Sequence, residues 1–130
     1  VRYSMELEVI ISNTTDLLRV SAFDIMCIKA EGNYSTIILN DGDEHLVLFQ
    51  LGQLEHLLDN QLGTEASIFI RVGRGVIVNR EFLCAINLPK QLLTLRSRNG
   101  HKVAMNASKE SLRQLKELIE HHVRKGGYDE

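Results

Sequence analysis

The sequence predicts a mainly β, antiparallel protein with one covering helix and a second helix near its C-terminal end. Short apolar runs with a period of two are separated by turn sequences such as Asp-Gly and Asn-Gly, which is typical of antiparallel hairpins. Only two stretches, after Leu51 and after Ser108, space their leucines by three and four residues, as amphipathic helices do. The chain has 130 residues, which suits a single domain with one main core.

Five strands are predicted before the first helix. They are Glu6 to Ile11, Leu17 to Ser21, Ile25 to Glu31, Ser35 to Leu39 and Leu46 to Leu48. The polar sequence Ser-Asn-Thr-Thr joins the first two, and Asp41-Gly42 supplies a tight turn before the fifth. Consecutive strands joined by such turns should pair antiparallel.

The first helix is predicted to begin near Leu51 and to end at Gly63. Its leucines, at positions 51, 54, 57 and 58, lie on one face, and a glycine is a common helix terminator. Because this stripe lasts only two turns, it indicates a helix that covers a sheet rather than a coiled coil.

Five more strands and a final helix follow. The strands are Ile68 to Val72, Val76 to Val78, Leu83 to Leu88, Gln91 to Arg96 and Lys102 to Met105. Pro89 ends the third of these, and Asn99-Gly100 forms the last hairpin turn. Either Asn106 or Ser108 can cap the helix, whose apolar face runs to Val123.

Three places in this pattern carry polar groups that can bind a ligand. Arg74 lies between two glycines at the tip of a turn, where a guanidinium can fork onto a phosphate or a guanine edge, although a solvated surface arginine explains this turn alone better. Asn33, Tyr34 and Ser35 offer an amide, a phenol and a hydroxyl, but Gly-Asn is equally ordinary turn chemistry. Lys109 opposes the dipole at the start of the last helix, which hints at a bound anion.

The charges divide the chain into two parts. From Arg71 to Lys116 there are ten Lys and Arg against two Asp and Glu, a local charge of +8. The remainder holds five basic and fifteen acidic residues, a charge of −10, and the two parts give the net charge of −2. The net charge alone argues against a nucleic-acid partner, whereas the distribution favours an anionic partner for one face.

Several classes of function are excluded by what the sequence lacks. We find no paired carboxylates, no nucleophile with a base and no phosphate loop, so the chain is not expected to be an enzyme, and no cofactor is expected. Cys27 and Cys84 are expected to be unpaired core residues, and adjacent His121 and His122 converge poorly on a metal. Without a signal peptide or a membrane-length apolar run, a cytoplasmic location is expected and a membrane partner is not.

With these features in view, the chain resembles the LytTR family of bacterial DNA-binding domains over Leu17 to Ile119. The similar segments are residues 24–34 (DIMCIKAEGNY), the helix around 54–58, residues 69–72 (FIRV), residues 77–80 (IVNR), and the final strand, polar turn and helix. Their order and spacing together carry the resemblance.

The resemblance implies an elongated fold whose loops enter successive major grooves of double-stranded DNA. By position, the DNA contacts fall at Asn33-Tyr34-Ser35, at Arg71 with Gly73-Arg74-Gly75, and at Asn106-Ala107, with Lys109 as a phosphate contact. Many members have R-x-H-R-S at 71–75 and Ser-Arg at 106–107, so this chain departs from the family at both places. The resemblance also implies a transcription regulator, often of a two-component system with an upstream receiver or sensor domain. Such a regulator would occupy two half-sites as a homodimer.

We therefore expect an N-terminal strand or linker at 1–16, a LytTR-like domain at 17–123 and a flexible tail at 124–130. The main functional hypothesis is a sequence-specific DNA-binding output domain. The alternative is a protein-interaction or regulatory module on the same fold that has lost DNA binding, which the acidic remainder and the missing arginine would suit.

Overall fold

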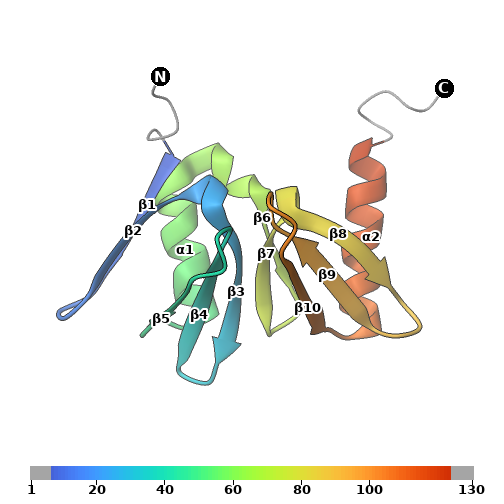
Figure 1. The fold of residues 1–130 in the computed structure, drawn as a ribbon, viewed down its shortest axis with the longest axis horizontal. Helices are drawn as coiled ribbons and strands as arrows, with labels where there is room; N and C mark the ends of the chain where they lie inside the picture. Colours follow the sequence, from blue (N-terminus) through green and yellow to red (C-terminus); the bar gives the residue numbers. More distant parts are fainter. Residues whose placement is uncertain (1–6, 124–130) are drawn as a thin grey trace.

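Ten strands and two α-helices form the part of the chain that the computed structural model describes, residues 7–123 (Figure 1). The strands are β1 (Glu8–Ser12), β2 (Leu17–Ser21), β3 (Ile25–Glu31), β4 (Tyr34–Leu39), β5 (Glu44–Val47), β6 (Phe69–Val72), β7 (Val76–Asn79), β8 (Leu83–Asn87), β9 (Leu92–Arg96) and β10 (Lys102–Asn106). The helices are α1 (Leu51–Leu62) and α2 (Lys109–Val123), and the short 3-10 helices are η2 (Ala22–Asp24), η3 (Gly63–Ile68) and η4 (Arg80–Phe82). Every strand pair is antiparallel, so the predicted fold class is confirmed.

A five-stranded sheet of order β5-β4-β3-β7-β6 lies at the centre of the molecule. The first four residues of β3, IMCI, are all buried. The pairing with β4 shifts between Ile25 and Cys27, so the strand bulges at Met26. Ile25 and Ile28 belong to one core, whereas Met26 and Cys27 belong to a second core. One strand thus supplies side chains to both.

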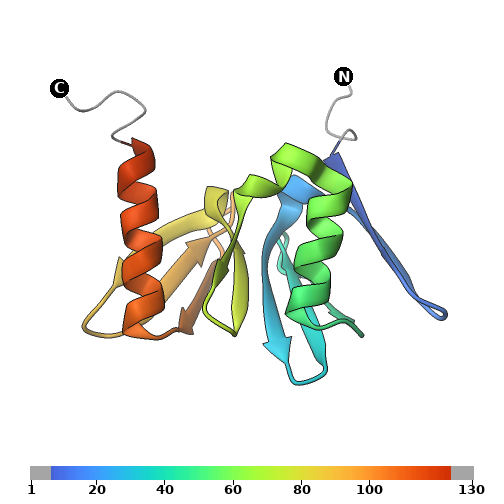
Figure 2. The ribbon, with the colours of Figure 1, turned by 180° about the vertical axis from the view of Figure 1, so that it is seen from behind.

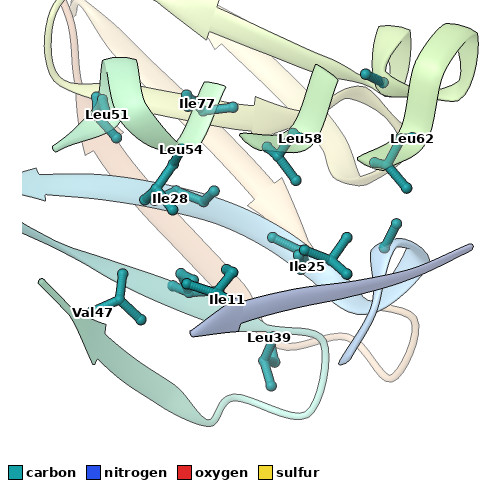
Figure 3. Close-up of a cluster of buried hydrophobic side chains, with 14 residues drawn as sticks. Ile11, Ile25, Ile28, Leu39, Val47, Leu51, Leu54, Leu58, Leu62 and Ile77 are labelled. Atoms are coloured by element: carbon teal, nitrogen blue, oxygen red, sulfur yellow. The ribbon is translucent and has the colours of Figure 1, made fainter. Parts of the chain in front are cut away.

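The first core lies between this sheet, the β1–β2 hairpin and α1. The helix lies across one face of the sheet, and four of its leucines point toward the strands (Figure 3): Leu51, Leu54, Leu58 and Leu62. Full burial of one such side chain stabilises a protein by about 1.5–3 kcal/mol. Val9 and Ile11 of β1 are also buried here. The β1–β2 hairpin therefore packs in the same core as α1.

The ends of α1 explain its length. Its first turn is capped by Gln53, whose side-chain oxygen accepts a hydrogen bond from the backbone N–H of Gln50 at 2.8 Å. At the other end the N–H of Gly63 bonds to the carbonyl of Asp59. The predicted helix and its terminator are both confirmed, and the structure adds η3 between α1 and β6.

The second core is formed by the three-stranded sheet β10-β9-β8, α2 and the central sheet. Leu93 and Leu95 of β9 and Leu112 of α2 are fully buried in it. The leucine spacing of α2 thus buries one face of the helix, while its other positions are mostly exposed.

The β9–β10 turn lies on the upper side of the sheets in Figure 1, and Arg98 on this turn contacts residues next to the central sheet. Its guanidinium forms an ion pair with Asp24 at 3.0 Å, donates to the carbonyl of Phe23, and lies 5.2 Å from the ring centre of Phe82. Its backbone N–H donates to Oδ1 of Asn40 at 2.9 Å. We call this set of residues the upper clasp.

Some expected boundaries and environments were wrong. Gln91 precedes β9 instead of starting it, because its φ of 52° is incompatible with an extended strand. Leu48 lies outside β5, and Ile68 belongs to η3. Cys84 is exposed instead of buried, because β8 is an edge strand whose register shifts between Leu83 and Ala85. The expected tail at 124–130 lies outside the described residues.

Candidate nucleic-acid interface

The turns that carry the predicted binding groups lie along one edge of the molecule, the lower edge in Figures 1 and 2. This edge contains the β3–β4 turn (32–33), the β6–β7 turn (73–75), the β8–β9 turn (88–91) and the β10–α2 junction (106–109). We call this surface the loop edge. Alternate turns of antiparallel strands emerge on the same side, which brings together segments far apart in sequence.

The β6–β7 turn presents Arg74 to solvent. The strands pair up to Val72 and Val76, so three residues form the turn, and all three are exposed. Arg74 has no hydrogen-bond or ion-pair partner within residues 7–123. Gly73 has a φ of +62°, and a Cβ there would lie 2.9 Å from Oγ of Ser111. The turn therefore fits closely against the first turns of α2.

Arg71 has a different environment from Arg74. Its Nη1 forms an ion pair with Glu55 of α1 at 2.8 Å, and its Nε donates to the carbonyl of Gly73 at 3.0 Å. These bonds hold the turn relative to α1. Arg71 thus links the turn that carries Arg74 to α1, while its Nη2 has no hydrogen bond within the described residues.

The β10–α2 junction is capped by Ser108. Its hydroxyl oxygen accepts from the N–H of Ser111 at 3.1 Å and lies 2.8 Å from the Ser111 hydroxyl. Of the two capping candidates, Asn106 and Ser108, the structure selects the serine. Lys109, the first residue of α2, is exposed and has no ion-pair partner among the described residues. Its charge opposes the helix dipole without a compensating contact in the protein.

The β6–β7 turn and this junction together line a hollow of about 480 Å³. Its lining is mostly small and polar: Gly73, Arg74, Gly75, Asn106, Ala107, Ser108 and Ser111. Two of the three predicted contact loops therefore meet at one surface. Such a lining offers backbone and hydroxyl groups to a polar partner.

Asn106 is held by the neighbouring β8–β9 turn. Its Nδ2 donates to the carbonyl of Gln91 at 3.1 Å, and the N–H of Ala107 donates to the same carbonyl at 3.3 Å. Sequence reasoning missed this turn as part of the site, because Gln91 was assigned to a strand. The sequence Pro89-Lys90-Gln91, a proline followed by two polar residues, could have indicated an exposed turn there.

The three residues expected at the β3–β4 turn differ in their exposure to solvent. Asn33 and Tyr34 are exposed, and Oδ1 of Asn33 accepts a long hydrogen bond, 3.5 Å, from Nε2 of Gln50. Ser35 is fully buried, and its hydroxyl donates to the carbonyl of Phe49 at 2.8 Å. We therefore leave Ser35 out of the proposed interface and assign it to holding the segment before α1 against β4.

The positive charges between Arg71 and Lys116 fall into two groups. Four are in ion pairs: Arg71, Arg98, Arg113 and Lys116. Six have no ion-pair partner within residues 7–123: Arg74, Arg80, Lys90, Arg96, Lys102 and Lys109. Of these six, Arg74, Lys90 and Lys109 belong to the loop edge, whereas Arg96 and Lys102 face each other at the opposite end of β9 and β10. Only part of the net charge of +8 between Arg71 and Lys116 can therefore face one partner.

The remaining candidates are the possible metal ligands and the two cysteines. Within them no group of three or more His, Cys, Asp or Glu side chains could hold a metal ion, and the side chain of His122 lies outside that part. Cys27 and Cys84 are both free. Burial raises the pKa of the Cys27 thiol to about 12, so it stays protonated at neutral pH. Neither helix has the length and apolar character needed to cross a membrane, within residues 7–123.

Comparison with known proteins identifies the family of this chain. The family model described as the LytTr DNA-binding domain matches residues 15–120. The chain belongs to the LytTr family. This confirms the resemblance drawn from the sequence, and it makes the chain a member of a family of DNA-binding domains rather than of enzymes.

A solved structure supports the LytTr fold. The chain is similar to the LytTr DNA-binding domain of a protein described as a methyl-accepting/DNA response regulator from Bacillus cereus, with a TM-score of 0.60 and 21% sequence identity. The match covers 86% of this chain and 95% of that chain. Among the curated proteins, no match was found.

Proposed function

We propose that this LytTr domain is the sequence-specific DNA-binding output domain of a bacterial transcription regulator, and that the loop edge reads the major groove. The observation that carries the proposal is Arg74, which is exposed and has no partner among the described residues, on a turn that Arg71 bonds and that packs closely against Ser111. A guanidinium held in this way can donate two parallel hydrogen bonds to O6 and N7 of guanine.

The other proposed contacts follow from their exposure. Asn33 and Tyr34 offer polar groups at one end of the loop edge, and Lys109 offers a phosphate contact at the start of α2. Asn106 and Ala107 lie in the β10–α2 junction that precedes Lys109. The β3–β4 turn, the β6–β7 turn and the β10–α2 junction are spread along the long axis of the molecule (Figure 1). The proposal therefore requires an extended stretch of duplex.

The remaining parts of the proposal concern the whole regulator. We propose that it acts in the bacterial cytoplasm, that a receiver or sensor domain controls it, and that two copies occupy two half-sites. The response-regulator description of the Bacillus cereus relative supports the second point. The stoichiometry on duplexes with one and two half-sites tests the third.

The test begins with selection of bound sequences from a random duplex pool, followed by titrations of the selected and a scrambled duplex. Affinity should fall steeply between about 50 and about 200 mM salt, and the selected duplex should bind more tightly. A folded domain that binds neither duplex at low salt would contradict the proposal.

That negative result would favour the interaction-module alternative. A specific feature would suit it: the end of the molecule at β2 and β5 exposes Leu17, Leu46 and Leu48, at 65%, 58% and 60%. Exposed apolar clusters of this kind often mark protein contacts.

A further inference from the structure

We propose that the β8–β9 turn is a further contact with the DNA backbone, in which Lys90 neutralises a phosphate and Asn106 is a positioning residue that holds the turn in place. The inference rests on the proposed function, because it adds a contact to the same loop edge. It also changes the role of Asn106, which the sequence had suggested as a DNA-contacting residue.

The first observation is the backbone of Gln91. It is the one residue other than glycine with a positive φ, 52°, in the part of the chain that the structure describes. A side chain destabilises this conformation, so it persists only where surrounding contacts fix it. Here its N–H donates to the carbonyl of Leu88 at 3.0 Å, and its own carbonyl accepts from Asn106 Nδ2 and from the N–H of Ala107.

The second observation is that only Leu88 of this turn packs against the second core. Pro89, Lys90 and Gln91 are all exposed. The turn is nevertheless closed tightly, because the N–H of Lys90 donates to Oδ1 of Asn87 at 2.9 Å. What the bonds achieve is a fixed position for an exposed lysine that has no ion-pair partner within residues 7–123.

The third observation is where the bonds lead. Gln91 is tied to Asn106 and Ala107, the next residue Ser108 caps α2, and Ser111 of that helix fits against Gly73. The turns that carry Arg74, Lys90 and Lys109 are therefore held by one connected set of contacts at the loop edge. In Figures 1 and 2 the β8–β9 turn lies on the same lower edge as the other turns.

The chemistry fits a phosphate better than a base. Lysine is a compact charge on a flexible stem, which suits a phosphate oxygen and gives little base discrimination. One amide proton of Asn106 is already engaged by Gln91, so its side chain is held by the turn and only the second proton and Oδ1 remain for a base.

The experiment measures the salt dependence of binding to a fluorescein-labelled duplex of mixed sequence. Lys90→Ala should lower the slope of log affinity against log salt by about 0.9, and it should weaken selected and scrambled duplexes by the same factor. Lys102→Ala is the matched control, since Lys102 is also exposed and unpaired in the described chain but lies at the far end of β10. It should leave the slope unchanged.

Asn106→Ala tests the positioning role. It should lower the slope as Lys90→Ala does, and the double variant should lose no more than Lys90→Ala alone. Adding Gln91→Gly to Asn106→Ala should restore the slope, because glycine adopts the required φ without the asparagine. Loss of sequence preference with an unchanged slope would instead make Asn106 a base reader and overturn this role.

The outcomes separate the two proposals. If the unaltered domain binds no duplex, both fail. If it binds duplex and depends on Arg74, but Lys90→Ala keeps the full slope, only the contact at the β8–β9 turn fails. Circular dichroism of each variant confirms folding, and Lys90→Ala alone decides the contact if Asn106→Ala does not fold.

Discussion

Two turns of this protein each carry an arginine, and the two arginines have different environments. Gly73-Arg74-Gly75 and Ser97-Arg98-Asn99-Gly100 each lie between two adjacent antiparallel strands; Arg74 is flanked by two glycines, whereas Arg98 is flanked by Ser97 and Asn99. Arg98 is in an ion pair with Asp24, lies over Phe82 and donates to Phe23, whereas Arg74 has no partner within residues 7–123.

The difference shows what distinguishes a structural arginine from one available to a ligand. The upper clasp joins two sheets whose facing residues are carboxylate, amide and aromatic groups, so its arginine contributes to stability. At the loop edge the arginine that stabilises is Arg71, which leaves the guanidinium of Arg74 free to bind. The residue type is the same, but the first turn spans residues 73–75 and the second residues 97–101, and different elements surround them.

The largest expected effect comes from adding a methyl group to each turn. Gly73→Ala should lower the free energy of unfolding by about 2–3 kcal/mol, since a positive φ costs about 1–2 kcal/mol and the new Cβ displaces the Ser111 hydroxyl from Ser108. Gly100→Ala, with φ +91° and no atom within 4 Å of its Cβ, should lose only about 1–2 kcal/mol. Urea denaturation measures both.

The same two glycine variants should also differ in their affinity for duplex DNA. Gly73→Ala should also weaken duplex binding, because the substitution shifts the turn that carries Arg74. Gly100→Ala should bind duplex with unchanged affinity, since it alters the upper edge. Equal losses of affinity in the two variants would mean that both act through global stability.

Arg74→Lys addresses readout directly. It keeps the charge and removes the forked pair of donors, so about 1–3 kcal/mol of preference for the selected duplex should be lost while affinity for scrambled duplex is retained. Titration of both duplexes at one salt concentration measures this. An equal loss on both would make Arg74 a phosphate contact and move base readout to Asn33 or Tyr34.

Much of this arrangement could be predicted from the sequence, because its signals are local. The turns are marked by Asp-Gly, Asn-Gly and Gly-Arg-Gly, and the helices by leucine spacing, so the gathering of alternate turns at one edge follows from antiparallel pairing. That Arg74 lies on an exposed turn needed no three-dimensional information.

The roles of the other polar residues could not be predicted, because they depend on distant partners. Arg71 meets Glu55 across 16 positions, Asn106 meets Gln91 across 15, and Arg98 meets Asp24 across 74. The exposure of Cys84 depends on a bulge in an edge strand, which leaves no periodic signal in five residues. Ser35 looked like a loop hydroxyl because the strand begins one residue earlier, at Tyr34.

Arg98→Ala tests the other half of the comparison. It removes an ion pair, a hydrogen bond and a cation–π contact, and because the side chain is 54% exposed we expect a loss of about 1–2 kcal/mol of stability. Duplex affinity and its salt slope should stay unchanged. A fall in the salt slope would show that the upper clasp also contacts DNA.

The smallest expected effect is that of single lysines, and it tests whether position decides the role of a free charge. Lys109 and Lys102 are both exposed and without ion-pair partners in the described residues, but Lys109 lies at the loop edge and Lys102 faces Arg96 at the other end of β10. Lys109→Ala should lower the salt slope by about 0.9 and weaken all duplexes alike, because a phosphate contact carries no sequence information. Lys102→Ala should leave the slope unchanged and raise stability by a few tenths of a kcal/mol, since it relieves a like-charge pair across two strands, roughly 0.2–1 kcal/mol at most. Binding titrations across a salt series and thermal melts measure the two effects. If both variants lower the slope equally, DNA binding depends on the net charge of the second half of the chain and not on the position of each lysine. The loop edge is then not the interface.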